Sequence, residues 1–124
     1  MTEELLNKLT DFVKEHLPYR DSNLIKQYIE QHENYHTIDY AVDEKGDIVG
    51  VCRWNITQGG TTAHLLDFAV RKDFRSKGVG RDLLKRGLHR FNRVKYLIYE
   101  RGKKYPNRKQ KMIPVEQILK RRVI

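Results

Sequence analysis

The sequence predicts a single domain of mixed α/β (α+β) class over residues 1–124, in which an antiparallel meander of strands is followed by a βαβ unit. Three observations support this prediction. Apolar residues recur at helical spacing near the N-terminus, the middle of the chain alternates with a period of two, and a glycine pair later separates an apolar run from an amphipathic one. A chain of 124 residues is long enough for one such core and short for two.

Two helices are predicted before the first strand. Thr2 can cap the first helix, whose opening turn is acidic, and Pro18 ends it. Asp21 or Ser22 begins a second, shorter helix with one apolar face. Because their apolar residues fit a packed stripe, both helices are interpreted as core elements. The stripe of the first helix consists of Leu5, Leu6, Leu9, Phe12, Val13 and Leu17.

The next section predicts a three-stranded meander. The run at 36–42 alternates apolar and polar residues, and Gly46 supplies a turn before a second strand at 48–57. A further turn at 58–60 leads to a third strand at 61–70. This third strand is apolar on both faces near its end, which is typical of an inner strand.

A βαβ unit follows the meander. Val79, Leu83, Leu84, Leu88 and Phe91 recur at helical spacing after the glycine pair, and residues 94–100 form a fourth strand. We expect this strand to lie parallel to residues 62–70 and near them. The basic segment 101–111 is interpreted as a loop or an irregular hairpin, and Pro114 as the start of a final helix.

The net charge of +9 is unevenly distributed. Residues 1–70 hold 6 Lys and Arg against 12 Asp and Glu, whereas residues 71–124 hold 19 against 4. So basic a half-chain favours an anionic partner, such as a phosphorylated cofactor, a nucleic acid or an acidic protein. The alternative is a solvated basic surface with no partner.

Cysteine content and hydropathy indicate the cellular compartment in which the protein works. Cys52 is the single cysteine, so no internal disulfide or cysteine zinc cluster is available, which favours the reducing cytoplasm. The sequence shows neither a signal peptide nor an apolar run long enough to span a membrane. We therefore expect a cytoplasmic protein without a membrane partner.

The segment RKDFRSKGVGRDLLKR, at 71–86, has the features of a phosphate-binding loop. Gly78 and Gly80 allow close approach of the backbone, and the following helix start offers free N–H groups and a positive dipole end. A P-loop is excluded because no glycine pair of the required spacing precedes Lys and Ser/Thr. A dinucleotide fingerprint is excluded because Leu83 stands where its third glycine is needed.

The run VRKDFRSKGVGRDLL resembles the acetyl-CoA-binding motif of the GNAT acetyltransferase superfamily. That motif reads Arg/Gln-x-x-Gly-x-Gly/Ala and matches Arg75, Gly78 and Gly80, with the strand-ending Val70 five residues before Arg75. The order of elements is also similar, over residues 1–100. The resemblance implies an acyl-CoA N-acyltransferase-like mixed sheet and an enzyme that transfers an acetyl group from acetyl-CoA to a primary amine.

The resemblance also implies how this cosubstrate is held, without a metal. Backbone groups of Phe68 and Val70 would pair with the pantetheine arm between the strands 62–70 and 94–100, which splay in this family. Basic side chains, including Arg75, would meet the 3′-phosphate. The pyrophosphate would be bound by the amides of Ser76, Lys77, Gly78, Val79, Gly80 and Arg81.

The catalytic residues that the resemblance implies are less sharply defined. His64 is the first candidate base, five residues before Ala69, and Asp67 is the second. Strand alternation predicts that His64 lies with Leu66 and Phe68, opposite Asp67. The alternative for His64 is a hydrogen-bonded strand histidine, and the Val70 amide would hold the oxyanion.

Tyr105 is the candidate general acid, with Tyr99 behind it, and here the chain departs from the family pattern. About 24 residues stand where the family has a further helix and two strands that help to form the acceptor site. A reduced enzyme, or one completed by a homodimer, fits this departure.

Two other functions stay open. Segment 101–124 carries nine Lys and Arg against one Glu, and Tyr105 could stack on a base, so 71–124 could form a nucleic-acid-binding module. A degenerate acetyltransferase fold that binds acyl-CoA or a partner is the other alternative.

Overall fold

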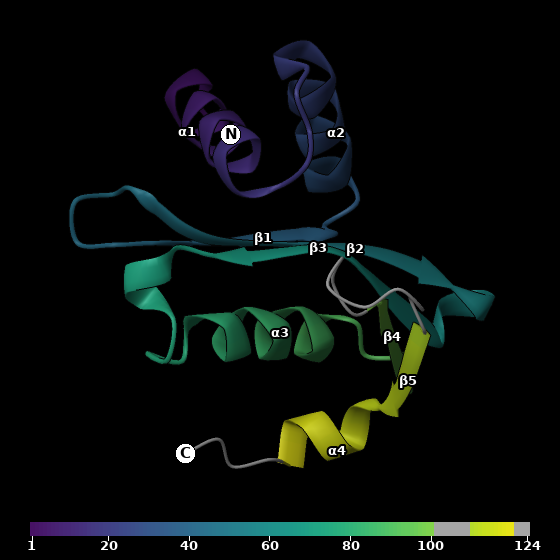
Figure 1. Cartoon of the computed structure of the whole chain (residues 1–124). Coiled ribbons are helices and arrows are strands. Elements are labelled where there is room, and N and C mark those ends of the chain that lie inside the picture. The colour runs from purple at the N-terminus through teal and green to yellow at the C-terminus, as the bar shows by residue number, and fades with distance from the viewer. Residues whose placement is uncertain (101–109, 121–124) are drawn as a thin grey trace.

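The computed structural model describes residues 1–100 and 110–120 as a five-stranded sheet with helices on both faces (Figure 1). The strand order is β1-β2-β3-β4-β5; β3 and β4 pair in parallel, and the other neighbouring strands among these residues pair antiparallel. The elements, in chain order, are α1 (Glu3–His16), α2 (Ser22–Asn34), β1 (Ile38–Val42), β2 (Ile48–Thr57), β3 (Thr62–Val70), α3 (Val79–Arg90), β4 (Tyr96–Glu100), β5 (Gln110–Pro114) and α4 (Val115–Lys120). The predicted meander and βαβ unit are confirmed.

Helices α1 and α2 form a hairpin that covers one face of β1, β2 and the end of β3 (Figure 1). Their predicted starts are confirmed, because the Thr2 side chain accepts a hydrogen bond from the Leu5 amide and Asp21 accepts two from the first turn of α2. Apolar stripes of both helices pack on the sheet. The buried cluster consists of Leu6, Leu9, Phe12, Val13, Ile25, Ile29, Ile48 and Val51.

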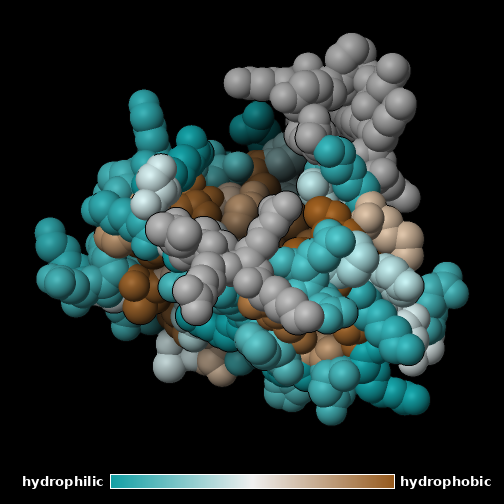
Figure 2. Space-filling model, turned by 90° about the horizontal axis from the view of Figure 1, so that it is seen from below, coloured by the Kyte–Doolittle hydropathy of each residue, from teal (hydrophilic) through white to brown (hydrophobic). Residues whose placement is uncertain are grey.

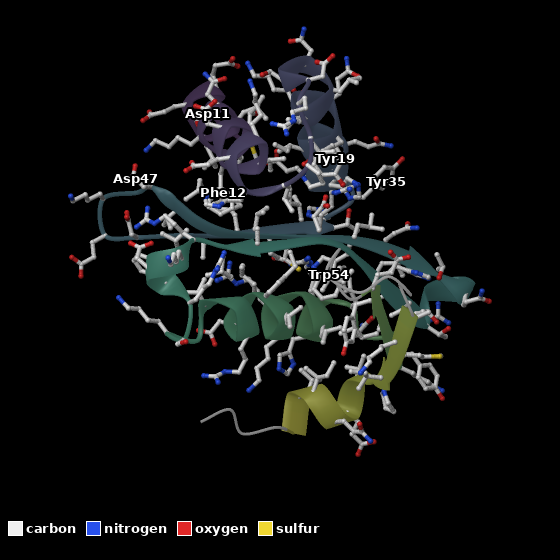
Figure 3. All side chains as sticks on the ribbon, viewed as in Figure 1. Asp11, Phe12, Tyr19, Tyr35, Asp47 and Trp54 are labelled. Atoms are coloured by element: carbon white, nitrogen blue, oxygen red, sulfur yellow. The ribbon has the colours of Figure 1, made fainter. Side chains whose placement is uncertain are left out.

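The opposite face of the sheet carries α3 and, beyond it, α4 (Figure 1). Trp54 is fully buried on this face, as Figure 3 shows below the sheet, and its indole Nε1–H donates to Asp39. Arg90 of α3 donates two hydrogen bonds to the same carboxylate, at 2.6 and 2.8 Å. This buried network joins β1 to α3 and fixes the helix that follows the glycine pair.

A β-bulge interrupts the pairing of β2 with β3. Arg53 pairs with Asp67 and Trp54 with Leu65, so Leu66 has no one-to-one partner. The bulge places Leu65 and Phe68 on the α3 side, while Asp67 contacts Tyr19 of the helical hairpin. The predicted alternation, with His64 and Phe68 on one face and Asp67 on the other, is therefore wrong beyond the bulge.

The C-terminal segment differs from its prediction in one respect. Residues from Gln110 form a regular strand, β5, which pairs antiparallel with β4, and Pro114 ends this strand one residue before α4. Ile113 pairs with Leu97, so backbone pairing with β4 decides this strand in a sequence with no clear alternation. Within 1–100 and 110–120, no helix is long and apolar enough to cross a membrane.

Candidate active site

The glycine pair lies at the junction of β3 and α3. Gly78 caps α3 in the left-handed conformation, with φ of 84°, and its carbonyl accepts the first helical hydrogen bond from Asp82. Ser76 also has a positive φ, of 69°. Among the described residues no side chain caps α3 at Gly78, so the N–H groups of its first turn remain available for a ligand.

Gly80 allows the first turn of α3 to lie against β3. A Cβ atom at Gly80 would be 2.7 Å from Cζ of Phe68 and 3.4 Å from Cγ2 of Val70. Such distances exclude a larger residue unless the helix moves away from the strand. The glycine therefore sets how closely the helix N-terminus approaches the strand end.

A cavity of about 710 Å³ opens between this junction and the C-terminal end of α1. Arg75 spans the loop by donating from Nε to the Val70 carbonyl, at 3.1 Å, and Lys77 lies over the Phe74 ring. Fixed positive charge thus surrounds the free amides. The cavity is lined by His16, Phe68, Ala69, Val70, Phe74, Arg75, Ser76, Gly78, Gly80 and Arg81.

Among the described residues, no strand pairs with the β4-facing edge of β3 beyond its first residues. Pairing with β4 covers only residues 62–64, and the two strands diverge from Leu65 onward. The Arg71 amide donates to the Val49 carbonyl of β2, so Phe68 and Val70, which alternate with it, direct their backbone groups away from β2 and toward this opening. The exposed edge could pair with an extended ligand.

Three neighbouring cavities follow this edge. The cavity at the glycine junction shares Phe68 and Arg81 with an apolar cavity of about 380 Å³ between β3, β4, α3 and α4. Figure 2 shows this side of the molecule, where hydrophobic residues lie among hydrophilic ones. The apolar cavity shares Leu65 and Tyr99 with a third of about 220 Å³. A long ligand bound at the glycine junction would therefore reach the third cavity.

His64 and Glu100 line this third cavity from β3 and β4. The His64 Nε2 lies 2.9 Å from the Thr57 hydroxyl. Since His64 is paired with Ile98, Glu100 follows on the same face, two residues along. Glu100 is absent from the sequence prediction, although its place at the end of a predicted parallel strand was a usable signal. Tyr105, the predicted acid, lies outside the described residues.

Asp67, the second predicted base, is instead held in a buried ion pair. Its side chain is paired with Arg53 Nε at 2.5 Å and accepts a hydrogen bond from the Tyr19 hydroxyl at 2.8 Å. Figure 3 shows Tyr19 beside α2, in the layer above the sheet. Burial, together with Asp67, raises the pKa of Tyr19, which keeps this donor protonated. With both carboxylate oxygens engaged, Asp67 is poorly placed to take a proton from a substrate.

The same arginine contacts His32 at the end of α2. Arg53 Nη1 lies 3.1 Å from His32 Nε2, and the Thr37 hydroxyl lies 2.7 Å from Nδ1. Because arginine can only donate, this geometry assigns the proton to Nδ1. Burial, and then Arg53, lower the pKa of His32, so the ring is neutral at pH 7.

Lowering the pH from about 7 to about 5 is expected to destabilise the protein partly through His32. An unfolded histidine accepts a proton near pH 6.5, whereas the folded state binds it only at lower pH. Between these two pKa values the unfolded state binds more protons than the folded state, so the free energy of unfolding decreases as the pH is lowered. His32→Gln keeps an acceptor for Arg53 but does not titrate, so its Tm should fall less over this range. His89→Gln, on the exposed side of α3, should keep the wild-type slope, and a wild-type slope for His32→Gln would contradict the assignment.

This fold and site define a domain of the acyl-CoA N-acyltransferase type. The model of the acetyltransferase (GNAT) family matches residues 2–100. The chain therefore belongs to that family. No curated protein sequence matches the chain.

Solved structures support the fold. An aminoglycoside 6′-N-acetyltransferase complexed with coenzyme A superposes with a TM-score of 0.66 at 21% identity, over 80% of this chain and 56% of that one. Ard1 from Thermoplasma volcanium gives 0.66 at 19% identity, over 86% and 72%. A phosphinothricin acetyltransferase from Sinorhizobium meliloti, in complex with AcCoA, gives 0.66 at 15% identity, over 86% and 65%. The chain thus spans little more than half the length of the first of these proteins.

Proposed function

We propose that this protein transfers an acetyl group from acetyl-CoA to a primary amine. The observation that carries the proposal is the N-terminus of α3, which no side chain caps in the described part of the chain and which Gly80 sets beside a strand edge left unpaired there. Support comes from the family, and from similar structures that contain coenzyme A or AcCoA. The amine is the part that the family does not specify.

The chain's own groups would hold acetyl-CoA, which supplies the activated thioester. The amides of residues 76–81 would bind the pyrophosphate, with charge from Arg75 and Arg81, which line the cavity, and from Lys77, which lies over the Phe74 ring. The backbone of Phe68 and Val70 would pair with the pantetheine arm in the gap between β3 and β4. The acetyl end would then lie in the cavity of His64 and Glu100.

His64 and Glu100 would bind and deprotonate the amine. The Glu100 carboxylate can pair with the incoming ammonium, and the His64 imidazole can accept its proton, after which the amine lone pair can attack. Val70 lies six residues from His64, about 20 Å along a strand. Its amide therefore cannot donate a hydrogen bond to a thioester carbonyl that lies next to His64. We assign the oxyanion instead to the bulge at Leu66, which lines the same cavity.

His64→Ala and Glu100→Gln are expected to lower kcat/KM by about 10²-fold or more, with acetyl-CoA binding unchanged. The measurement is coenzyme A release in an amine screen, with a pH profile for each variant. His89→Ala, on the exposed side of α3, is the control and should retain wild-type rates. Wild-type rates and pH profiles in both site variants would remove these residues from the mechanism.

The predicted anionic partner of residues 71–124 and the predicted homodimer stay predictions. Arg75, Lys77 and Arg81 belong to the proposed cosubstrate site, and Arg90 is bound to Asp39. These contacts account for part of the basic charge without a nucleic acid. A scaffold that binds acyl-CoA without turnover would show cosubstrate binding and no coenzyme A release with any acceptor.

A further inference from the structure

A groove of about 480 Å³ lies on the helical-hairpin side of the sheet, beside the proposed reaction centre. Leu66, the bulge residue, lines both this groove and the cavity of His64 and Glu100. Asn55, also in the groove, pairs across β2 and β3 with His64. A molecule in the groove would therefore sit next to the groups that we assign to amine binding, and the inference below rests on the proposed function.

The lining of this groove is uncharged and partly apolar. Leu66 and Tyr35 are 43% and 71% exposed, and Figure 3 shows Tyr35 at the end of the helical hairpin near the sheet. Gln31, Thr37 and Asn55 add amides and a hydroxyl. Among the lining residues in the described part of the chain, none is acidic.

The charges behind the groove do not favour a cation either. His32 lines the groove, and burial, followed by Arg53, lowers the pKa of its ring. On this side of the sheet, the Asp67 carboxylate is compensated by Arg53, and the Glu100 carboxylate, at the adjoining cavity, is assigned to the reacting ammonium. A second ammonium placed in the groove would lose its hydration beside a guanidinium and gain no counter-charge.

We infer that this groove is the acceptor site and that it selects a primary amine with a single positive charge and an apolar or uncharged body, against polyamines. The reacting ammonium itself is met by Glu100, at the adjoining cavity. The body of the acceptor packs against Leu66 and Tyr35. The same chemistry can come from a free alkylamine or from the N-terminal residue of a peptide.

A pair of acceptors of equal size tests this inference. Hexylamine and 1,5-diaminopentane have similar length and differ by one terminal charge. With the full chain and saturating acetyl-CoA, kcat/KM from coenzyme A release should favour hexylamine by about tenfold or more. The peptides Leu-Gly-Gly and Lys-Gly-Gly repeat the comparison. A preference for Leu-Gly-Gly with both alkylamines inert supports the inference and identifies a peptide terminus as the source.

Asn55→Asp, which adds a carboxylate without changing size, should lower the selectivity ratio several-fold. Asn92→Asp, at an exposed position beyond α3, is the matched control and should leave the ratio unchanged. The inference is overturned if the doubly charged acceptors are acetylated as well as hexylamine and Leu-Gly-Gly. It is also overturned if the protein binds acetyl-CoA but acetylates neither hexylamine nor Leu-Gly-Gly, or if Asn55→Asp keeps the wild-type selectivity ratio. A protein that does not bind acetyl-CoA would instead overturn the proposed function.

Discussion

Replacing Gly80 with leucine is expected to abolish acetyl-CoA binding. Even a Cβ atom at this position would lie 2.7 Å from the end of the Phe68 ring. The larger side chain must displace the N-terminus of α3 from β3, and it fills the cavity in which the cosubstrate would lie. The helix amides and the strand edge would then no longer face one ligand at the same time.

Thermal unfolding with and without acetyl-CoA measures this effect. Acetyl-CoA at about 100 times its Kd should stabilise the wild type by about 2.7 kcal/mol, or several degrees in Tm, and should not shift Gly80→Leu. Circular dichroism shows whether the variant is folded. Arg75→Ala combined with Lys77→Ala offers a second route to weaker binding, without a steric clash. His89→Leu should keep the full shift, and an undiminished shift in Gly80→Leu would contradict the site.

Replacing Arg53 with methionine is expected to lower the free energy of unfolding by about 3–5 kcal/mol. The substitution leaves the Asp67 carboxylate buried, at 7% exposure, without its counter-charge. It also removes a donor to the Tyr19 hydroxyl and a cation that lies 4.5 Å from the Tyr28 ring centre. This buried network stabilises the contact between the helical hairpin and the sheet.

Urea unfolding of a double-mutant cycle tests the ion pair. Arg53→Met with Asp67→Leu should recover much of the loss, because no unpaired charge remains buried. Lys8→Met removes loose, partly exposed pairs with Glu4 and Asp47 and a hydrogen bond to the Gly46 carbonyl. Because these groups stay in contact with water, the change in stability should be less than about 1 kcal/mol. If Arg53→Met were as mild as Lys8→Met, Asp67 would not depend on this pair, and its role as a base would regain support.

The sequence predicted those parts of the fold that local patterns determine. Thr2 and Asp21 cap helices because their side chains satisfy amides within the same turn. The glycine pair was identified from the strand and helix patterns on either side of it and from its resemblance to the GNAT motif. A left-handed Gly78 and a Gly80 without a side chain are local requirements of a strand-to-helix junction. Strand β5 was missed because it is specified by pairing with β4, and its own sequence does not alternate clearly between apolar and polar residues.

The candidate site was harder to predict where it depends on contacts between distant segments. Asp67 looks like a base in isolation, and only the fold brings Arg53 and Tyr19 to it. The bulge at Leu66 cannot be read from a period of two, and it reverses the face of Phe68 relative to His64. Glu100 enters the site because two parallel strands diverge beside it.

The central claim is that the glycine junction binds acetyl-CoA, and isothermal titration calorimetry of the wild-type chain with acetyl-CoA tests it most directly. We predict saturable binding at one site, with a Kd between about 1 μM and 1 mM. The absence of binding heat up to millimolar acetyl-CoA, at two temperatures, would contradict the claim.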